Sequence, residues 1–282
     1  LRQGRREALL SRTQAGLVSW TDEGREYVLR PPKITTFRPL TDNDRGAGHG
    51  FERAQWAVAG RYARCVDIAV DSSLEGRGAL TYTFELATPA RTPVTLRYEI
   101  NADARIHLTA EYPGEAGVPT IPAFGLEWAL PGELNHLRYH GLGPVETYAD
   151  RHAGARLGVW TTTAAQDYAP YLVPQETGNH SEVRWAEITD DAGRGICVRR
   201  HNPDADGSTF NVSLLPYSSA QIEEASRQWE LPHPSTAPFT HLRLLAAHMG
   251  VGGDDSWGSP VHDAYQIPAA NPLRLDVDMW LI

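Results

Sequence analysis

The sequence predicts an all-β fold, and two patterns in its 282 residues support this prediction. Segments that alternate apolar and polar residues, or that are rich in β-branched and aromatic residues, recur about every ten to fifteen residues. The 25 glycines and 20 prolines supply turns between these segments. Regular short strands joined by turns are typical of an antiparallel sandwich or barrel. We therefore expect one large domain over residues 1–282.

The alternation predicts strands in nearly every part of the chain. In the first part, the expected strands are residues 25–30, 65–71, 79–87, 94–101 and 104–112. The pattern then continues at residues 124–131, 136–143, 155–163, 181–190, 195–201, 209–217, 240–250 and 273–282. Five tryptophans in or near these strands are expected in the core: Trp56, Trp128, Trp160, Trp185 and Trp280.

One segment, residues 218–229, has the periodicity of a helix. A serine at 218 or 219 can cap its beginning, and Ile222, Ala225 and Trp229 fall on one face. Prolines follow it in "LPHP" and would end it. The prediction is an all-β domain with one short helix inserted.

Composition excludes some classes of function. The net charge of −9 argues against nucleic acid as a partner. No run of eighteen apolar residues occurs, so we expect no transmembrane helix and no membrane partner. The two cysteines, Cys65 and Cys197, are far apart in the chain and suggest reduced thiols in a bacterial cytoplasm.

The familiar catalytic motifs are absent from the sequence. It contains no G-x-S-x-G, no phosphate-binding P-loop and no H-E-x-x-H. The 11 histidines are scattered, and we expect neither a metal site nor a cofactor in this chain. What remains is a set of loops rich in aromatic and carboxylate residues, at residues 37–48, 141–158, 168–185 and 250–260. Such loops suit sugars, whose C–H faces stack on indoles and whose hydroxyls pair with carboxylates and amides.

Four motifs in these loops carry a family resemblance. "RPLTDNDRG", "GLGPVETYADR", "PYLVPQETGNHSEVRW" and "HMGVGGDDSWGSPVH" occur in the same order in the C-terminal domain of family 2 glycoside hydrolase β-galactosidases. The chain resembles that domain from about residue 11 to its end, and the same domain occurs alone as the small chain of two-chain β-galactosidases. The resemblance implies a large antiparallel β-supersandwich like that of galactose mutarotases.

The resemblance also implies a role. The domain is non-catalytic: it is the last part of an enzyme that hydrolyses terminal β-galactosides with retention, as found in lactose metabolism. The two catalytic glutamates and the Mg²⁺ ligands lie in a barrel domain that this chain lacks. The implied partners are that barrel domain or large chain, and the galactoside substrate. The full enzyme is expected to be oligomeric, and this chain alone is expected to be inactive.

The family uses a loop tryptophan of this domain as a platform for the substrate and its leaving group, and that residue matches Trp257. Its neighbours Asp254, Asp255 and Ser256 are secondary candidates for substrate contact. The glycines around them would let the loop project from its sheet. The alternative is that Trp257 closes one end of the sandwich as a core residue.

The other motifs are interpreted mainly as structural. Asp42, Asn43 and Asp44 could bind a cation or hydroxyl groups, but such clusters more often make turns and helix caps. Three charged residues of the second motif are expected to pair with each other or with another domain: Glu146, Asp150 and Arg151. Three residues of the third motif are possible interdomain or sugar contacts: Glu176, Asn179 and His180.

A second reading of the chain is a free-standing, mutarotase-like sugar-binding module or aldose epimerase. Such an enzyme interconverts anomers with a histidine acid and a glutamate base. Glu176 with His180 or His140 would be the pair. No specific spacing supports this reading, and a barrel encoded upstream of Leu1 would exclude it.

Overall fold

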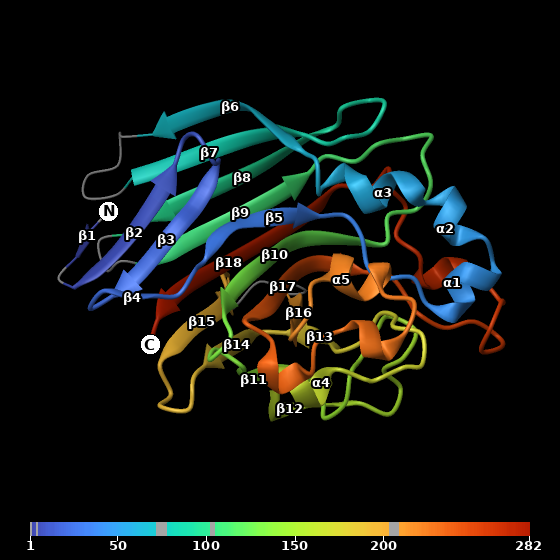
Figure 1. Cartoon of the computed structure of the whole chain (residues 1–282). Helices are drawn as coiled ribbons and strands as arrows, with labels where there is room; N and C mark the ends of the chain where they lie inside the picture. Colours follow the sequence, from blue (N-terminus) through green and yellow to red (C-terminus); the bar gives the residue numbers. More distant parts are fainter. Residues whose placement is uncertain (1, 4, 72–77, 102–104, 203–208) are drawn as a thin grey trace.

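In the described part of the chain, the strands form three antiparallel sheets (Figure 1). The computed structural model describes residues 2–3, 5–71, 78–101, 105–202 and 209–282. Residue 104, expected to begin a strand, lies outside the described residues. The predicted all-β class is confirmed, because every strand pairing in the three sheets is antiparallel.

The largest sheet has nine strands, and β12 and β6 are its two edges. In spatial order its strands are β12 (Arg156–Thr163), β11 (His136–Gly143), β14 (Trp185–Thr189), β15 (Gly195–Arg200), β18 (Leu273–Leu281), β9 (Ile106–Tyr112), β8 (Pro93–Ile100), β7 (Gly78–Glu85) and β6 (Arg64–Asp71). All of these strands overlap the ranges expected from the sequence.

The second sheet has five strands and the third has four. The five-stranded order is β13 (Asn179–Val183), β16 (Phe210–Leu215), β17 (Phe239–His248), β10 (Ala123–Pro131) and β5 (Arg30–Thr35). The four-stranded order is β1 (Arg2–Gln3), β2 (Arg6–Ser11), β3 (Gly16–Asp22) and β4 (Arg25–Glu26). The strand expected at residues 181–190 is in fact two, β13 and β14, which belong to different sheets. Likewise, the strand expected at 25–30 is divided between β4 and β5.

The core lies between the sheets and follows from the two-residue period of the strands. In β8, the buried side chains are Val94, Leu96, Tyr98 and Ile100, and the residues between them are more exposed. One cluster of buried side chains includes members of all three sheets: Leu17, Leu108, Leu126, Leu242 and Val277 are each 0% exposed.

The tryptophan prediction is correct for Trp56 and Trp128, which are almost completely buried. Trp160 is partly buried and packs against the same core. The prediction is wrong for Trp185 and Trp280, which are only half-buried. Their neighbours along the strand are buried on the inner face, so these two indoles lie on the outer face of the nine-stranded sheet. Each is covered by an arginine, with Arg138 over Trp185 and Arg105 over Trp280.

The helix expected at residues 218–229 is shorter than predicted. Helix α5 (Ser219–Glu224) begins as expected, because the Ser218 hydroxyl accepts the Gln221 N–H and the Gln221 side chain accepts the Ser218 N–H. It ends at Ala225, which is extended, and a separate 3₁₀ turn follows at Gln228–Glu230.

The described residues contain four further helices that were not expected from the sequence. They are α1 (Asp42–Gly46), α2 (His49–Glu52), α3 (Ala54–Ala59) and α4 (Ala164–Asp167). Short 3₁₀ turns also occur at Pro234–Thr236 and Asp263–Tyr265. Within the described residues, no helix is long and apolar enough to cross a membrane.

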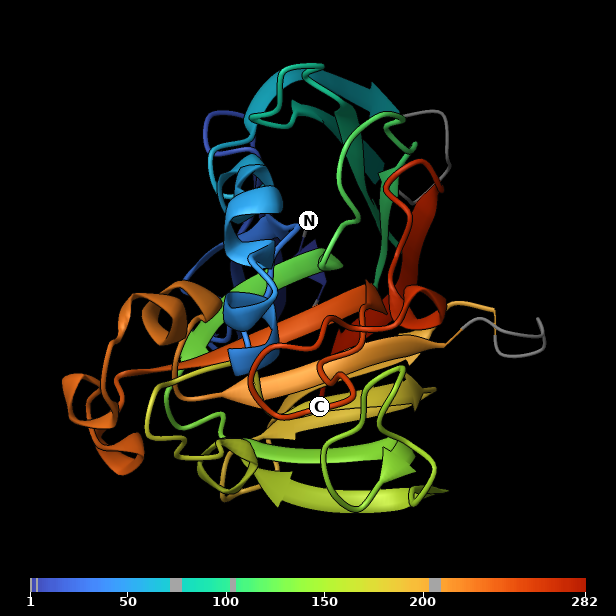
Figure 2. The same ribbon diagram turned by 90° about the vertical axis from the view of Figure 1, so that its right-hand side faces the viewer.

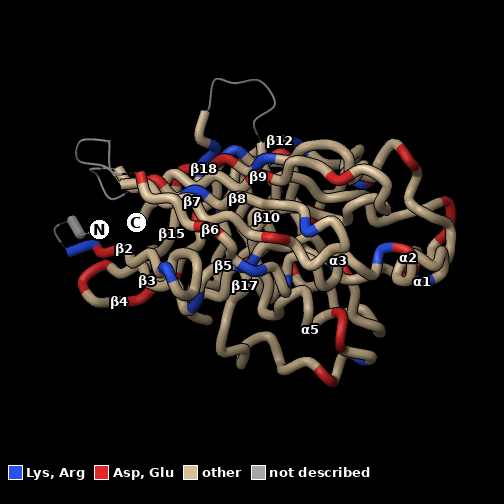
Figure 3. Tube along the Cα trace, turned by 90° about the horizontal axis from the view of Figure 1, so that it is seen from above, with Lys and Arg blue, Asp and Glu red and all other residues tan. Residues whose placement is uncertain are grey.

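The loops that the sequence analysis singled out lie at one end of the molecule. Figure 1 shows α1 to α3 on its right-hand side, next to the long loop that joins β17 to β18. Figure 2, which looks at that side, shows loops of the green and yellow part of the chain at the same end. Seen from above, acidic and basic positions are scattered over the trace among other residues (Figure 3).

Candidate functional site

The Gly250–Pro260 loop is organised around one carboxylate. Asp255 Oδ1 accepts the backbone N–H groups of Trp257 at 3.0 Å, Gly258 at 2.8 Å and Ser259 at 2.9 Å. These three hydrogen bonds, the one from Ser259 first, hold the pKa of Asp255 well below its usual value. The indole of Trp257 is 73% exposed at the tip of this turn. Asp255 therefore shapes the loop, and Trp257 faces outward from it.

Residues of two other motifs form hydrogen bonds to the backbone of this loop. The Asp150 carboxylate accepts the N–H groups of Val251 at 3.0 Å and Gly252 at 2.8 Å. Asn43 Nδ2 donates to the carbonyls of Asp255 at 2.8 Å and Ser259 at 2.9 Å. Residues about a hundred and two hundred positions earlier in the chain thus hold both sides of the loop.

Close packing against α1 completes the attachment. A Cβ on Gly46 would lie 2.0 Å from the Trp257 carbonyl oxygen, so only glycine allows this approach. The loop is therefore joined to α1 by main-chain contact as well as by the Asn43 amide.

A buried ion pair lies beneath the loop. Arg38 Nη1 is 2.5 Å from Asp44 Oδ2, and both side chains are almost fully buried. Arg38 also donates to the Gly250 carbonyl at 2.8 Å. Burial alone would raise the pKa of Asp44, but Arg38 and hydrogen bonds from His49 and Thr41 hold it well below its usual value.

A second buried ion pair lies beside the first. Arg243 Nη1 is 3.1 Å from Glu176 Oε2, and His248 Nε2 is 3.3 Å from Glu176 Oε1. Arg243 also donates to the Phe37 carbonyl at 3.0 Å. Burial would raise the pKa of Glu176, but Arg243 and His248 lower it from 4.5 to about 2. All four sequence motifs therefore meet in one hydrogen-bonded region.

Known proteins resemble this chain over almost its whole length. A family model described as beta galactosidase small chain matches residues 2–279, which is almost the whole chain. The chain belongs to the β-galactosidase small-chain family.

The relatives of this chain differ in length, so the chain covers a different share of each. Beta-galactosidase BgaC of Bifidobacterium adolescentis is 62% identical over 98% of this chain and 26% of its own length. The beta-galactosidase of Lactobacillus delbrueckii subsp. bulgaricus is 42% identical over 98% and 26%. The beta-galactosidase small subunit of Latilactobacillus sakei is 34% identical over 96% of this chain and 91% of its own length. The chain thus spans about a quarter of the first two relatives and nearly all of the third.

The solved structures that this chain resembles include a galactose mutarotase related enzyme from Lactobacillus acidophilus, with a TM-score of 0.47 and 8% identity, covering 100% of this chain and 96% of that one.

The residues predicted as interdomain or sugar contacts are buried within this β-galactosidase small-chain domain. Glu176 is 5% exposed, and Asn179 and His180 are 0% exposed. Both ring nitrogens of His180 are used, Nδ1 with the Tyr139 hydroxyl and Nε2 with Asp167, each at 2.8 Å. An interdomain or sugar contact of these three residues stays a prediction.

The other charged motifs behave partly as expected. Asp44 closes a capping box with Thr41 at the beginning of α1, which confirms a structural role for this motif. Glu146 pairs with Arg151 at 2.8 Å, also as expected. Asp150 does not join that pair but binds the loop backbone instead.

Sequence reasoning missed the two arginines and the histidine that complete the buried region. Arg243 interrupts the apolar run "HLRLLAAH" of β17. A cation within a buried strand must have an anionic partner, and this was the available signal. Arg38 and His248 are the first residues of the motifs "RPLTDNDRG" and "HMGVGGDDSWGSPVH", but the sequence analysis gave neither a role.

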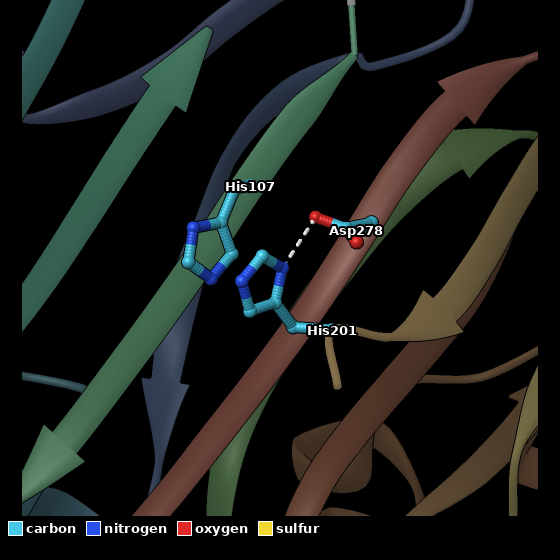
Figure 4. Close-up of side chains that lie close together, drawn as sticks. All are labelled: His107, His201 and Asp278. Carbon is cyan, nitrogen blue, oxygen red and sulfur yellow. Dashed lines mark hydrogen bonds and ion pairs between the residues drawn. The ribbon is translucent and has the colours of Figure 1, made fainter. Parts of the chain in front are cut away.

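Possible metal ligands come together elsewhere, on the outer face of the nine-stranded sheet (Figure 4). One ligand atom from each of His107, His201 and Asp278 lies within 4.8 Å of the others. The two rings, however, stack at 3.6 Å and 13°, so their lone pairs run nearly parallel and do not converge. His201 pairs with Asp278 at 2.9 Å and His107 with Asp276 at 2.6 Å. An imidazole-rich set also does not fit Mg²⁺, which prefers oxygen ligands.

The first prediction concerns the loop. Asp255→Ala removes the acceptor shared by three N–H groups, so amide hydrogen exchange at Trp257, Gly258 and Ser259 should become faster. Asp254→Ala is the matched control, because Asp254 contacts His262 at 2.9 Å and is exposed. NMR or mass spectrometry measures both variants. Equal exchange in the two would contradict the role given to Asp255.

The second prediction concerns pH. Because the folded-state pKa of Glu176 is depressed from 4.5 to about 2, its stabilising effect is complete above 4.5 and is lost as pH falls toward 2. Glu176→Gln should lower the free energy of unfolding by about 3 kcal/mol at neutral pH, since it leaves Arg243 without its buried partner.

Urea titrations of wild type and variant across this pH range test the prediction. The difference between the two proteins should shrink as pH falls below 4.5. Glu224→Gln, which removes an exposed pair with Arg61, should cost little at any pH. A Glu176→Gln effect that does not change with pH would show that ionised Glu176 does not stabilise the fold.

Proposed function

We propose that this chain is the non-catalytic C-terminal or small-chain part of a β-galactosidase that hydrolyses terminal β-D-galactosides with retention. It supplies the Trp257 loop as a platform for the substrate and its leaving group, together with part of the assembly surface. Two carboxylates about five ångströms apart would perform the chemistry. These glutamates and the Mg²⁺ ligands belong to a barrel domain or large chain outside this sequence.

The observation that carries this proposal is the exposure of Trp257 on a fastened loop. A core tryptophan is covered on both faces, whereas this one is 73% exposed while its backbone is fixed by Asp255, Asn43 and Asp150. An exposed indole held by a rigid base is suited to stacking on a sugar ring. A tryptophan that only covered the end of the sandwich would not need a loop backbone fixed by so many hydrogen bonds.

The assembly role is supported by apolar side chains in the same four regions. The exposed fractions are 91% for Phe51, 67% for Val145, 75% for Leu172 and 73% for Trp257. Phe51 lies in α2, just after the first motif, and the others lie in the second, third and fourth loops. Large exposed apolar groups gathered in this way are typical of an interaction surface. We infer that this end of the domain faces the barrel.

The mutarotase-like alternative gains no support from the placement of its residues. Glu176 pairs with Arg243 and His248, and His180 pairs with Asp167 and Tyr139. All of these groups are buried except Asp167, whose side chain is 10% exposed, so an aldose would have no access to an acid–base pair at Glu176. Both cysteines are free thiols, which fits the proposed cytoplasmic location.

The third prediction concerns activity. The purified chain should not turn over a chromogenic β-galactoside above the buffer rate, because the catalytic carboxylates belong to the partner. Adding a barrel-bearing large chain should restore hydrolysis, since the missing wall of the site can be supplied in trans. Turnover by the chain alone that persists after removal of contaminating enzyme would refute the proposal.

The fourth prediction concerns Trp257 itself. In the assembled enzyme, Trp257→Ala should weaken substrate binding by about 1–3 kcal/mol, the scale of one lost aromatic contact, and Trp257→Phe should retain part of it. The melting temperature of the chain should hardly change, because an exposed side chain contributes little packing.

Trp229→Ala is the matched control, because Trp229 is 75% exposed but lies after α5. It should leave Michaelis constants unchanged. A collapse of the melting temperature in Trp257→Ala with unchanged Michaelis constants would identify Trp257 as a core residue.

A further inference from the structure

A second hollow of the molecule lies away from the Trp257 loop, on the outer side of the five-stranded sheet. It has a volume of about 370 Å³ and is bordered by β5, β10, β17, α3 and α5. Small-molecule sites range from about 300 to 1,000 Å³, so this pocket has room for one or two sugar rings. Neither the Trp257 loop nor the buried ion pairs contribute to its walls.

The floor of the pocket is fixed by strand register. Glu127 on β10 pairs with Lys33 on β5, and Ala129 pairs with His241 on β17. Because positions 127 and 129 are two residues apart, these side chains share the outer face of the sheet. Helix α5 forms the opposite wall, and its Ser219 hydroxyl donates to Glu127 Oε2 at 2.6 Å.

The charges of the pocket wall balance. Its charged side chains are three cations and three carboxylates: Arg30, Lys33, Arg61, Glu127, Glu223 and Glu224. A phosphate or nucleotide site needs an excess of cations, and an apolar ligand would leave these charges unsolvated. A wall with equal numbers of donors and acceptors suits an uncharged ligand rich in hydroxyl groups, since each hydroxyl both donates and accepts.

Two of these groups have hydrogen-bonding capacity to spare. Across the described part of the chain, the Lys33 ammonium has neither an ion-pair partner nor a hydrogen-bond acceptor, although it stands directly opposite Glu127. Glu127 Oε2 accepts hydrogen bonds from Ser219 and lies 4.0 Å from Arg243 Nε, whereas Oε1 is open to a donor within the same described residues. Burial lowers the pKa of His241, which favours a neutral imidazole in the floor.

Phe239 supplies an apolar side to the pocket, and it is held by the Arg30 guanidinium 5.4 Å from its ring centroid. A sugar presents both kinds of surface, a face of C–H groups and a rim of hydroxyls. We propose that this pocket binds a neutral pyranose, with ring hydroxyls placed between the Lys33 ammonium and the Glu127 carboxylate. The site belongs to this chain alone and does not depend on the role proposed for Trp257.

Isothermal titration calorimetry on the 282-residue chain tests the proposal. The probes are galactose, glucose, lactose and a hexose 6-phosphate, and at least one uncharged sugar should bind. Lys33→Ala should weaken that binding about tenfold, the effect of one hydrogen bond to a charged group. Lys33 is exposed, so this variant should fold normally. Glu127→Gln should weaken it similarly while keeping an acceptor for Ser219.

Two control variants locate the binding. Arg156→Ala removes an exposed cation from the edge strand β12 and should leave the affinity unchanged. Trp257→Ala should also leave it unchanged, which separates this site from the proposed function.

Three results would overturn the proposal. They are the absence of binding by every uncharged sugar, an unchanged affinity in Lys33→Ala, and loss of binding in Trp257→Ala. Tighter binding of the hexose phosphate than of the hexose would also overturn it, because the ligand would then be an anion.

Discussion

Two buried arginine–carboxylate pairs determine how one end of this domain is built. Arg38 with Asp44, and Arg243 with Glu176, each take opposite charges out of water and place them beneath loops. A buried charge without its partner is strongly unfavourable, so each segment can occupy its position only if the other does. The remaining donors of the arginines bind carbonyls of Gly250 and Phe37, which joins main chain to the same unit. The position of the Trp257 loop is a consequence of this arrangement.

Most strands were predictable because strand residues alternate between core and solvent, but β1 to β3 were not among the strands expected from the sequence. β8 shows the clearest case, with every second side chain buried. The helices α1 to α3 were not predictable in the same way, because each has only four to six residues and cannot display a 3.6-residue period. The beginning of α1 was nevertheless recognisable from its polar residues, which form the cap. Where a strand ended inside one apolar–polar run, as between β13 and β14, the pattern gave no sign that the chain changes sheets.

Part of the candidate site can be recognised from the sequence, and the rest is visible only in the three-dimensional structure. Trp257 was found through a resemblance of motifs, and its exposure agrees with the role proposed for it. Asp150 could not be assigned, because its partners are backbone N–H groups a hundred residues later and no side-chain pattern encodes them. Glu176 was a candidate for interdomain or sugar contact because it is a lone carboxylate in the third motif. Its burial depends on Arg243, which comes from a different strand.

Among the described residues, nothing pairs with the outer sides of β6 and β12, the two edges of the nine-stranded sheet, and this bears on aggregation in concentrated solution. An unpaired edge exposes rows of N–H and C=O groups on which a strand from another molecule can assemble, the first step toward insoluble aggregates. β6 carries exposed Val66 and Val70, but Arg64 and Asp67 are exposed beside them. On β12, exposed Leu157 and Val159 follow the charged Arg156. A strand from another molecule that paired with either edge would bury a charged side chain. This is unfavourable, so the charged residues oppose polymerisation through these edges.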